Sequence, residues 1–159
     1  MAADHLAAPT PLEEHRRLAA FAGEWAGEEI IYPSRWTAGG PATARVTGRI
    51  DLNGCYLIQD AVQMRDGKET FATHGVFTYD REDRLYKLFW HDSLGYYPPS
   101  PASGGWSNKS LILVRGSLRG NARHVYEIID DDNYTMKIQF SPDAEGWADV
   151  LTGVYRRIH

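Results

Sequence analysis

The chain has 159 residues, with 17 Lys and Arg against 21 Asp and Glu, and a formal net charge of -4. This balance argues against a general nucleic-acid binder, which would carry a basic surface. The single cysteine, Cys55, excludes an internal disulfide and a zinc site built from cysteines alone. Neither an apolar run of about 20 residues nor a secretory leader is present, so we expect a cytoplasmic protein with one domain, residues 1–159.

The first part of the chain is predicted to be a flexible arm followed by one short helix. Residues 1–9 are small and polar and follow no period. Thr10 and Pro11 are typical of a helix start, and Gly23 is typical of a position just after a helix end. The predicted helix therefore runs from Pro11 to Ala22.

After Gly23 the apolar residues recur with the period of two that is typical of half-buried β-strands. Asn53-Gly54 and Asp66-Gly67 are typical of tight hairpin turns. Besides a first strand after Gly23, strands are predicted at 43–52, 55–64, 70–79, 85–92, 110–115, 124–129, 134–140 and 147–158. About nine or ten short strands in hairpin order predict a mainly β fold, an antiparallel up-and-down barrel with room inside for one small ligand.

Two segments do not show this alternation of apolar and polar residues. Residues 33–41 form a predicted loop that carries Trp36, and residues 93–108 form a longer one rich in proline and glycine. Long loops in compact domains are usually functional, so the second is expected to be a lid over the barrel mouth. Its Tyr97 and Trp106 are candidate ligand contacts; the alternative is that these aromatic side chains only cover the barrel wall.

One hairpin suggests a chemical site inside the barrel. If its turn pairs Asp80 with Arg84, His74 lies directly across from Trp90, and both face the interior together with Asp92. An imidazole beside a carboxylate can act as a general base, so His74 and Asp92 are the candidate catalytic pair and Trp90 a candidate ligand contact. The alternative is a structural hydrogen bond within a core.

Other residues are assigned by the direction in which they should point. Trp25 is expected to close one end of the barrel, and Glu29 shares its face of the strand. Further candidates for lining the cavity are Tyr56, Tyr126 and Glu127, whose directions the pattern leaves open. Arg157 is expected to pair with Glu127 or Asp149. The histidines have no metal-ligand spacing, so no metal site is expected.

Four segments resemble a mostly bacterial family, the domain of unknown function numbered fifteen-seventy-nine; they are residues 15–27, 75–80, 86–93 and 155–157. The resemblance implies a calycin-like barrel and no established activity. The opening Gly23-x-Trp25-x-Gly27 is also similar to lipocalins and to nitrobindin haem proteins, which hold haem by a histidine on the final strand. Residues 149–157 contain no histidine and His159 follows them, so the expectation is a protein without a cofactor.

Three functions are compatible with these patterns. The first is a barrel that binds an apolar or aromatic small molecule, because an aromatic-rich cavity with few polar groups is typical of ligand pockets. The second is a cofactor-independent cyclase, isomerase or dehydratase that uses His74 and Asp92. The third is a haem protein. The expected partner is a small-molecule ligand, with a homodimer as a further possibility and with neither nucleic acid nor membrane.

Overall fold

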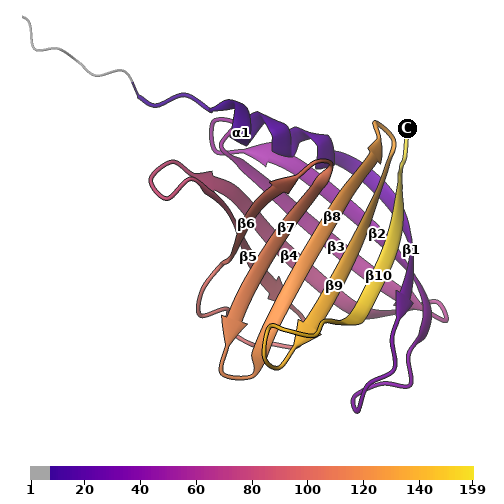
Figure 1. The fold of residues 1–159 in the computed structure, drawn as a ribbon. Coiled ribbons are helices and arrows are strands. Elements are labelled where there is room, and N and C mark those ends of the chain that lie inside the picture. The colour runs from indigo at the N-terminus through magenta and orange to yellow at the C-terminus, as the bar shows by residue number, and fades with distance from the viewer. Residues whose placement is uncertain (1–7) are drawn as a thin grey trace, which may run out of the picture.

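The computed structural model describes residues 8–159, and its strands form one closed antiparallel barrel (Figure 1). Each strand pairs with its neighbours in sequence, and the last strand pairs with the first. The strands are β1 (Gly23–Ile31), β2 (Gly40–Asp51), β3 (Tyr56–Arg65), β4 (Lys68–Asp80), β5 (Leu85–Asp92), β6 (Ala102–Ser107), β7 (Ser110–Ser117), β8 (Gly120–Asp130), β9 (Asn133–Ser141) and β10 (Ala148–Arg157). The predicted mainly β, up-and-down barrel is therefore confirmed.

A short helical segment lies across one end of the barrel, which we call the closed end (Figure 1). Helix α1 spans Glu13–Arg17 and continues as a tighter 3-10 turn, η1, over Leu18–Phe21. The helix begins two residues later than predicted, because the backbone N–H of Leu12 donates to Nδ1 of His15 (3.0 Å) and the chain becomes helical only from Glu13. Of the predicted arm, residues 1–7 lie outside the described part of the chain.

The closed end is filled by aromatic side chains, as the position of Trp25 predicted. Trp25 is 1% exposed, and its indole Nε1 donates to the carbonyl of Phe21 (3.1 Å). Its ring meets that of Tyr134 edge-on at 4.7 Å between centroids, and Phe21 meets Tyr134 in the same way at 5.3 Å. Edge-to-face contacts of this kind add to the stabilisation from burial alone. The closed end is thus packed with aromatic rings.

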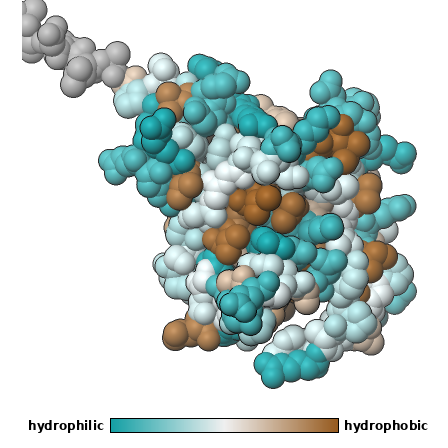
Figure 2. All heavy atoms as spheres, in the orientation of Figure 1, coloured by the Kyte–Doolittle hydropathy of each residue, from teal (hydrophilic) through white to brown (hydrophobic). Residues whose placement is uncertain are grey.

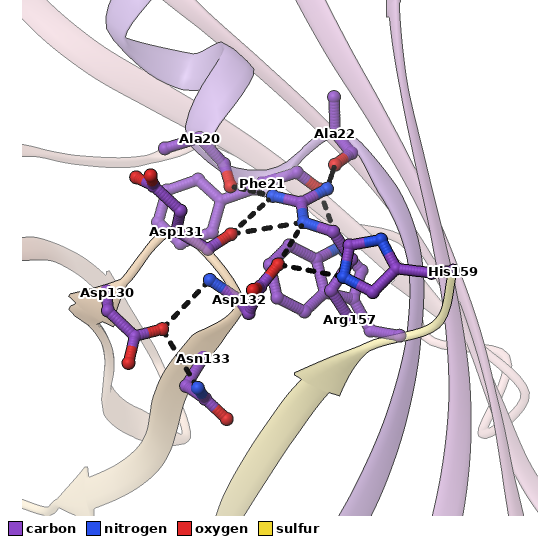
Figure 3. A network of polar contacts seen from close by, with 10 residues as sticks. Ala20, Phe21, Ala22, Asp130, Asp131, Asp132, Asn133, Arg157 and His159 are labelled. Atoms are coloured by element: carbon purple, nitrogen blue, oxygen red, sulfur yellow. Dashed lines mark hydrogen bonds and ion pairs between the residues drawn. The ribbon is translucent and has the colours of Figure 1, made fainter.

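Arg157, near the end of β10, connects the segments that meet at the closed end (Figure 3). Its guanidinium donates to the carbonyls of Ala22 (2.5 Å) and Asp131 (2.9 Å), and its Nε lies 3.5 Å from a carboxylate oxygen of Asp132. It also lies 4.2 Å above the Trp25 ring. The predicted pairing with Glu127 or Asp149 is wrong, because Arg157 reaches over the barrel end to the β8–β9 turn.

Strand β6 corrects the prediction of one long loop over residues 93–108. Only residues 93–101 connect β5 to β6, and the glycine-rich segment after them pairs with β5 and β7. Gly104 explains why glycine is used here: a Cβ at this position would overlap the backbone carbonyl of Ile112 on β7. Glycine inside a strand often marks such a close approach of two backbones.

We expect Gly104→Ala to lower the free energy of unfolding by about 1–3 kcal/mol, because the added methyl group forces β6 and β7 apart. Gly105→Ala is the matched control, since a Cβ there has no atom within 4 Å, and it should change stability by less than about 0.5 kcal/mol. Urea denaturation of both variants measures the difference. Equal losses in the two variants would contradict the close approach.

The register of β4 and β5 differs by one residue from the predicted pairing. Arg84 adopts a left-handed conformation (φ 61°), and Asp80 pairs with Leu85 instead of Arg84. The extra turn residue places His91 across from His74, and Gly75 across from Trp90. Because a shift of one residue exchanges the two faces of a strand, His74 lies on the outer wall. Its predicted interior position is wrong.

The outer wall of the barrel is mixed in polarity. On the face drawn in Figure 2, apolar residues form small separate groups among polar ones. None of the helices in the described residues has the length and apolar character needed to span a membrane.

Candidate functional site

The interior cavity lies in the half of the barrel away from the helix, which we call the open half. Its volume is about 30 Å³, room for one or two water molecules. The wall is mostly apolar, and the small side chains of Ala44 and Ala61 leave the space. The lining residues are Glu29, Ala44, Val46, Gln59, Ala61, Gln63, Phe71, Thr73, Trp90, Tyr134, Met136, Ile138, Leu151 and Tyr155.

A carboxylate lies inside this wall. Glu29 on β1 is 6% exposed, and its face of the strand is the one that the sequence predicted. Its Oε2 accepts a hydrogen bond of 2.5 Å from the hydroxyl of Tyr155, and its Oε1 accepts one of 3.1 Å from Nε2 of Gln63. Burial, followed by the nearby charge of Glu29, raises the pKa of Tyr155 well above its usual value, so this hydroxyl stays protonated and can donate.

Two glycines let Tyr155 reach this carboxylate. Gly27 on β1 and Gly153 on β10 lie beneath its ring; a Cβ on Gly27 would come within 2.5 Å of the ring, and one on Gly153 would overlap the hydroxyl. Gly153 is also the register partner of Glu29, so the tyrosine lies flat along the wall directly toward the carboxylate. The ring stacks on Tyr134 at 4.8 Å. The position of the Tyr155 hydroxyl is thus fixed by its neighbours.

Gln59 on β3 supplies the second polar feature of the cavity. The residue is 6% exposed and lines the cavity, and its amide nitrogen has no hydrogen-bond partner within the protein. Leaving a buried amide unpaired costs roughly 1–3 kcal/mol. Such a cost at one position in an otherwise apolar wall points to a water molecule or ligand group that accepts from this amide.

Two rings of the cavity wall, Phe71 near the start of β4 and Trp90 near the end of β5, are half-buried. Trp90 faces the interior as predicted, and its indole Nε1 donates to Oδ2 of Asp92 (3.0 Å). Asp92 also accepts from the backbone N–H of Leu94 (2.9 Å). The carboxylate of Asp92 therefore fixes the orientation of the Trp90 ring and the start of the β5–β6 loop.

The interior histidine is His124 on β8, not His74. It is 5% exposed, its ring centroid lies 4.9 Å from that of Trp90, and its Nδ1 has no partner within the protein. Burial, and to a smaller degree the charge of Arg115, lowers the pKa of His124 to about 4. His124 is therefore neutral at physiological pH. Glu127, three residues further along the same strand, points to the outside of the barrel. His124 therefore points to the inside.

His74 and Asp92, the candidate catalytic pair of the sequence analysis, are not in contact. Nδ1 of His74 lies 2.6 Å from a carboxylate oxygen of Asp60 on the outer wall, and that carboxylate also lies 3.6 Å from Arg49. Asp92 takes the interior face, opposite Thr73. A barrel wall thus separates His74 from Asp92.

Four of the candidate ligand contacts also lie away from the cavity. Tyr56 contributes to a groove on the outer wall, because Leu57 takes the interior face of β3. Glu127 is exposed on the outside of β8. Tyr97 is 84% exposed in the β5–β6 loop and does not line the cavity. Trp106 belongs to the closed end, where its ring stacks on Phe21 at 6.1 Å, so neither aromatic forms the predicted lid. Tyr126, by contrast, faces inward and is fully buried.

The described residues do not fit a haem. His159 lies outside the closed end, where its Nε2 is 3.1 Å from Asp132 (Figure 3). The ring of His124 is packed against Trp90 and Tyr126 and is not among the residues that line the cavity. Within residues 8–159, no group of three or more His, Cys, Asp or Glu side chains could hold a metal ion.

The sequence model of a family described as "Protein of unknown function (DUF1579)" matches residues 10–157. No curated protein matches the chain. Among solved structures, Rv2717c from M. tuberculosis is similar with a TM-score of 0.69 at 15% identity, over 93% of this chain and 99% of that one. The S-type phycobiliprotein lyase CPES from Guillardia theta is similar with a TM-score of 0.63 at 10% identity, over 94% of this chain and 99% of that one. At these identities the likeness concerns the fold.

Proposed function

Since the chain belongs to DUF1579, a family of proteins of unknown function, we propose its function from its own cavity: the barrel binds a small molecule with an apolar or aromatic body. The observation that carries this proposal is the amide of Gln59, which is buried and unpaired in a mostly apolar wall that Glu29 also lines. Ligand pockets combine such a wall with a few convergent polar groups. A fold shared with a phycobiliprotein lyase is compatible with a ligand inside the barrel.

The size of the cavity sets a condition on binding. An engineered cavity of about 150 Å³ holds a benzene ring, whereas this one measures about 30 Å³. Phe71 and Trp90 are the half-buried rings of its wall, so a ring-sized ligand enters when one of them turns outward. Asp92 holds Trp90 by a hydrogen bond, whereas the ring of Phe71 has no polar atom by which it could be held.

The structure gives no support to the catalytic alternative. It depended on His74 acting together with Asp92, and these residues lie on opposite faces of the wall.

A neutral aromatic probe, 2-naphthylmethanol, tests the proposal by NMR titration of the labelled protein. We expect shifts at residues of the open half, and we expect Ala61→Phe to abolish them by filling the cavity. Val62→Phe, the next residue on β3 and on its other face, is the matched control and should bind like wild type. Phe71→Ala should bind the probe about tenfold more tightly, because no ring has to be displaced. Shifts that persist in Ala61→Phe would place the probe elsewhere and refute the proposal.

A further inference from the structure

Glu29 is a buried carboxyl group without a cationic partner. None of the ion pairs formed by the described residues includes it, and it is the one charged side chain among the residues that line the cavity. Its two donors, Tyr155 and Gln63, are neutral. Buried carboxylates are normally paired with a cation, because desolvation of an isolated charge is costly. The cavity lining thus has one carboxyl group at a fixed point and no cationic side chain.

The carboxylate still has capacity for another donor. An ionised carboxylate offers about four lone-pair sites, and Glu29 uses one on each oxygen. Since the Tyr155 ring is held between Gly27 and Gly153 and stacked on Tyr134, the position of its hydroxyl is set by the wall and does not depend on a ligand. The hydrogen bonds therefore orient the carboxyl group without bringing a positive charge to it.

We propose that the ligand of this cavity is a cationic amine with an apolar or aromatic body, whose protonated nitrogen donates to Glu29. This inference rests on the proposed function and adds the substrate class. The apolar body lies against Ala44, Ala61 and Leu151, and an acceptor on the ligand, or a water, takes the free amide of Gln59. Anionic compounds are rejected, because no cation lines the cavity to offset a second negative charge.

Three probes with the same ring system separate the alternatives: 2-naphthylmethylamine, 2-naphthylmethanol and 2-naphthoic acid. At neutral pH the first is cationic, the second neutral and the third anionic. We expect wild type and Phe71→Ala to bind the amine at least tenfold more tightly than the alcohol, since hydrogen bonds between charged groups are the stronger ones. The acid should bind most weakly. Affinities are measured by NMR titration or calorimetry.

Glu29→Gln should remove the preference for the amine, so that the amine and the alcohol bind this variant with affinities within about threefold of each other. Glu28→Gln is the matched control, because Glu28 is the next residue on β1 and is exposed on the outer face. If Glu29→Gln does not fold, the comparison of amine and alcohol in wild type decides the question by itself. Equal affinities of amine and alcohol, both lost in Ala61→Phe, would overturn this inference and leave the proposed function standing. Binding of none of the three probes would overturn both.

Discussion

Replacing Trp25 with alanine is expected to lower the free energy of unfolding by about 3–5 kcal/mol, the range found for large buried aromatic side chains. Trp25 is 1% exposed and touches both the aromatic cluster of the closed end and the guanidinium of Arg157. The truncation leaves a cavity and also removes the indole donor to the Phe21 carbonyl. A loss of this size is a large fraction of the stability of an ordinary domain.

Urea denaturation at neutral pH gives the value, with Trp36→Ala as the matched control. Trp36 is 80% exposed in the β1–β2 loop, so the same chemical change there should alter stability by less than about 0.5 kcal/mol. Similar losses in the two variants would show that the closed end does not depend on its tryptophan.

Acid is expected to destabilise this protein through His124. The pKa of His124 is lowered from 6.5 to about 4 by burial, so the unfolded chain binds a proton at a higher pH than the folded one does. The neutral histidine contributes its full stability above pH 6.5, and that contribution is lost as the pH falls from about 6.5 to about 4. A difference of this size corresponds to a loss on the order of 3 kcal/mol across that range.

His124→Phe is the variant that isolates this effect. Phenylalanine keeps a ring between Trp90 and Tyr126, removes the unpaired Nδ1 and does not titrate. Stability measured by denaturation from pH 4 to pH 8 should fall less steeply in acid for the variant than for wild type, and the difference between the two proteins should be constant above pH 7. Parallel curves over the whole range would contradict the assignment of the acid sensitivity to His124.

The barrel could be predicted because its strands repeat one simple pattern and its turns carry strong signals. Asn53-Gly54 and Asp66-Gly67 end strands close to where the sequence indicates. Strand β6 was missed because its glycines are typical of loops, and only the three-dimensional approach of β7 explains Gly104. Strands that show an alternating side-chain pattern can therefore be predicted from the sequence. A strand whose residues are chosen for a close contact between two backbones cannot.

The site was harder to predict because one residue in one turn decides which face points inward. Arg84 is left-handed, a conformation that is uncommon for residues other than glycine, and the resulting shift moved His74 to the outside. The pattern left the directions of Tyr56, Tyr126 and Glu127 open, although outward-facing charged residues, Asp60 and Glu127, mark Gln59 and His124 as inward-facing. Glu29 was placed correctly by its spacing from Trp25.

The pairing of β1 with β10 has a consequence during synthesis. Trp25 is the register partner of Arg157, so the seam of the barrel joins residues from opposite ends of the described chain. Until β10 has left the ribosome, the emerging hairpins keep two unpaired strand edges, and such edges invite association with other chains. The wall of the barrel is therefore complete only once the last strand has paired with the first.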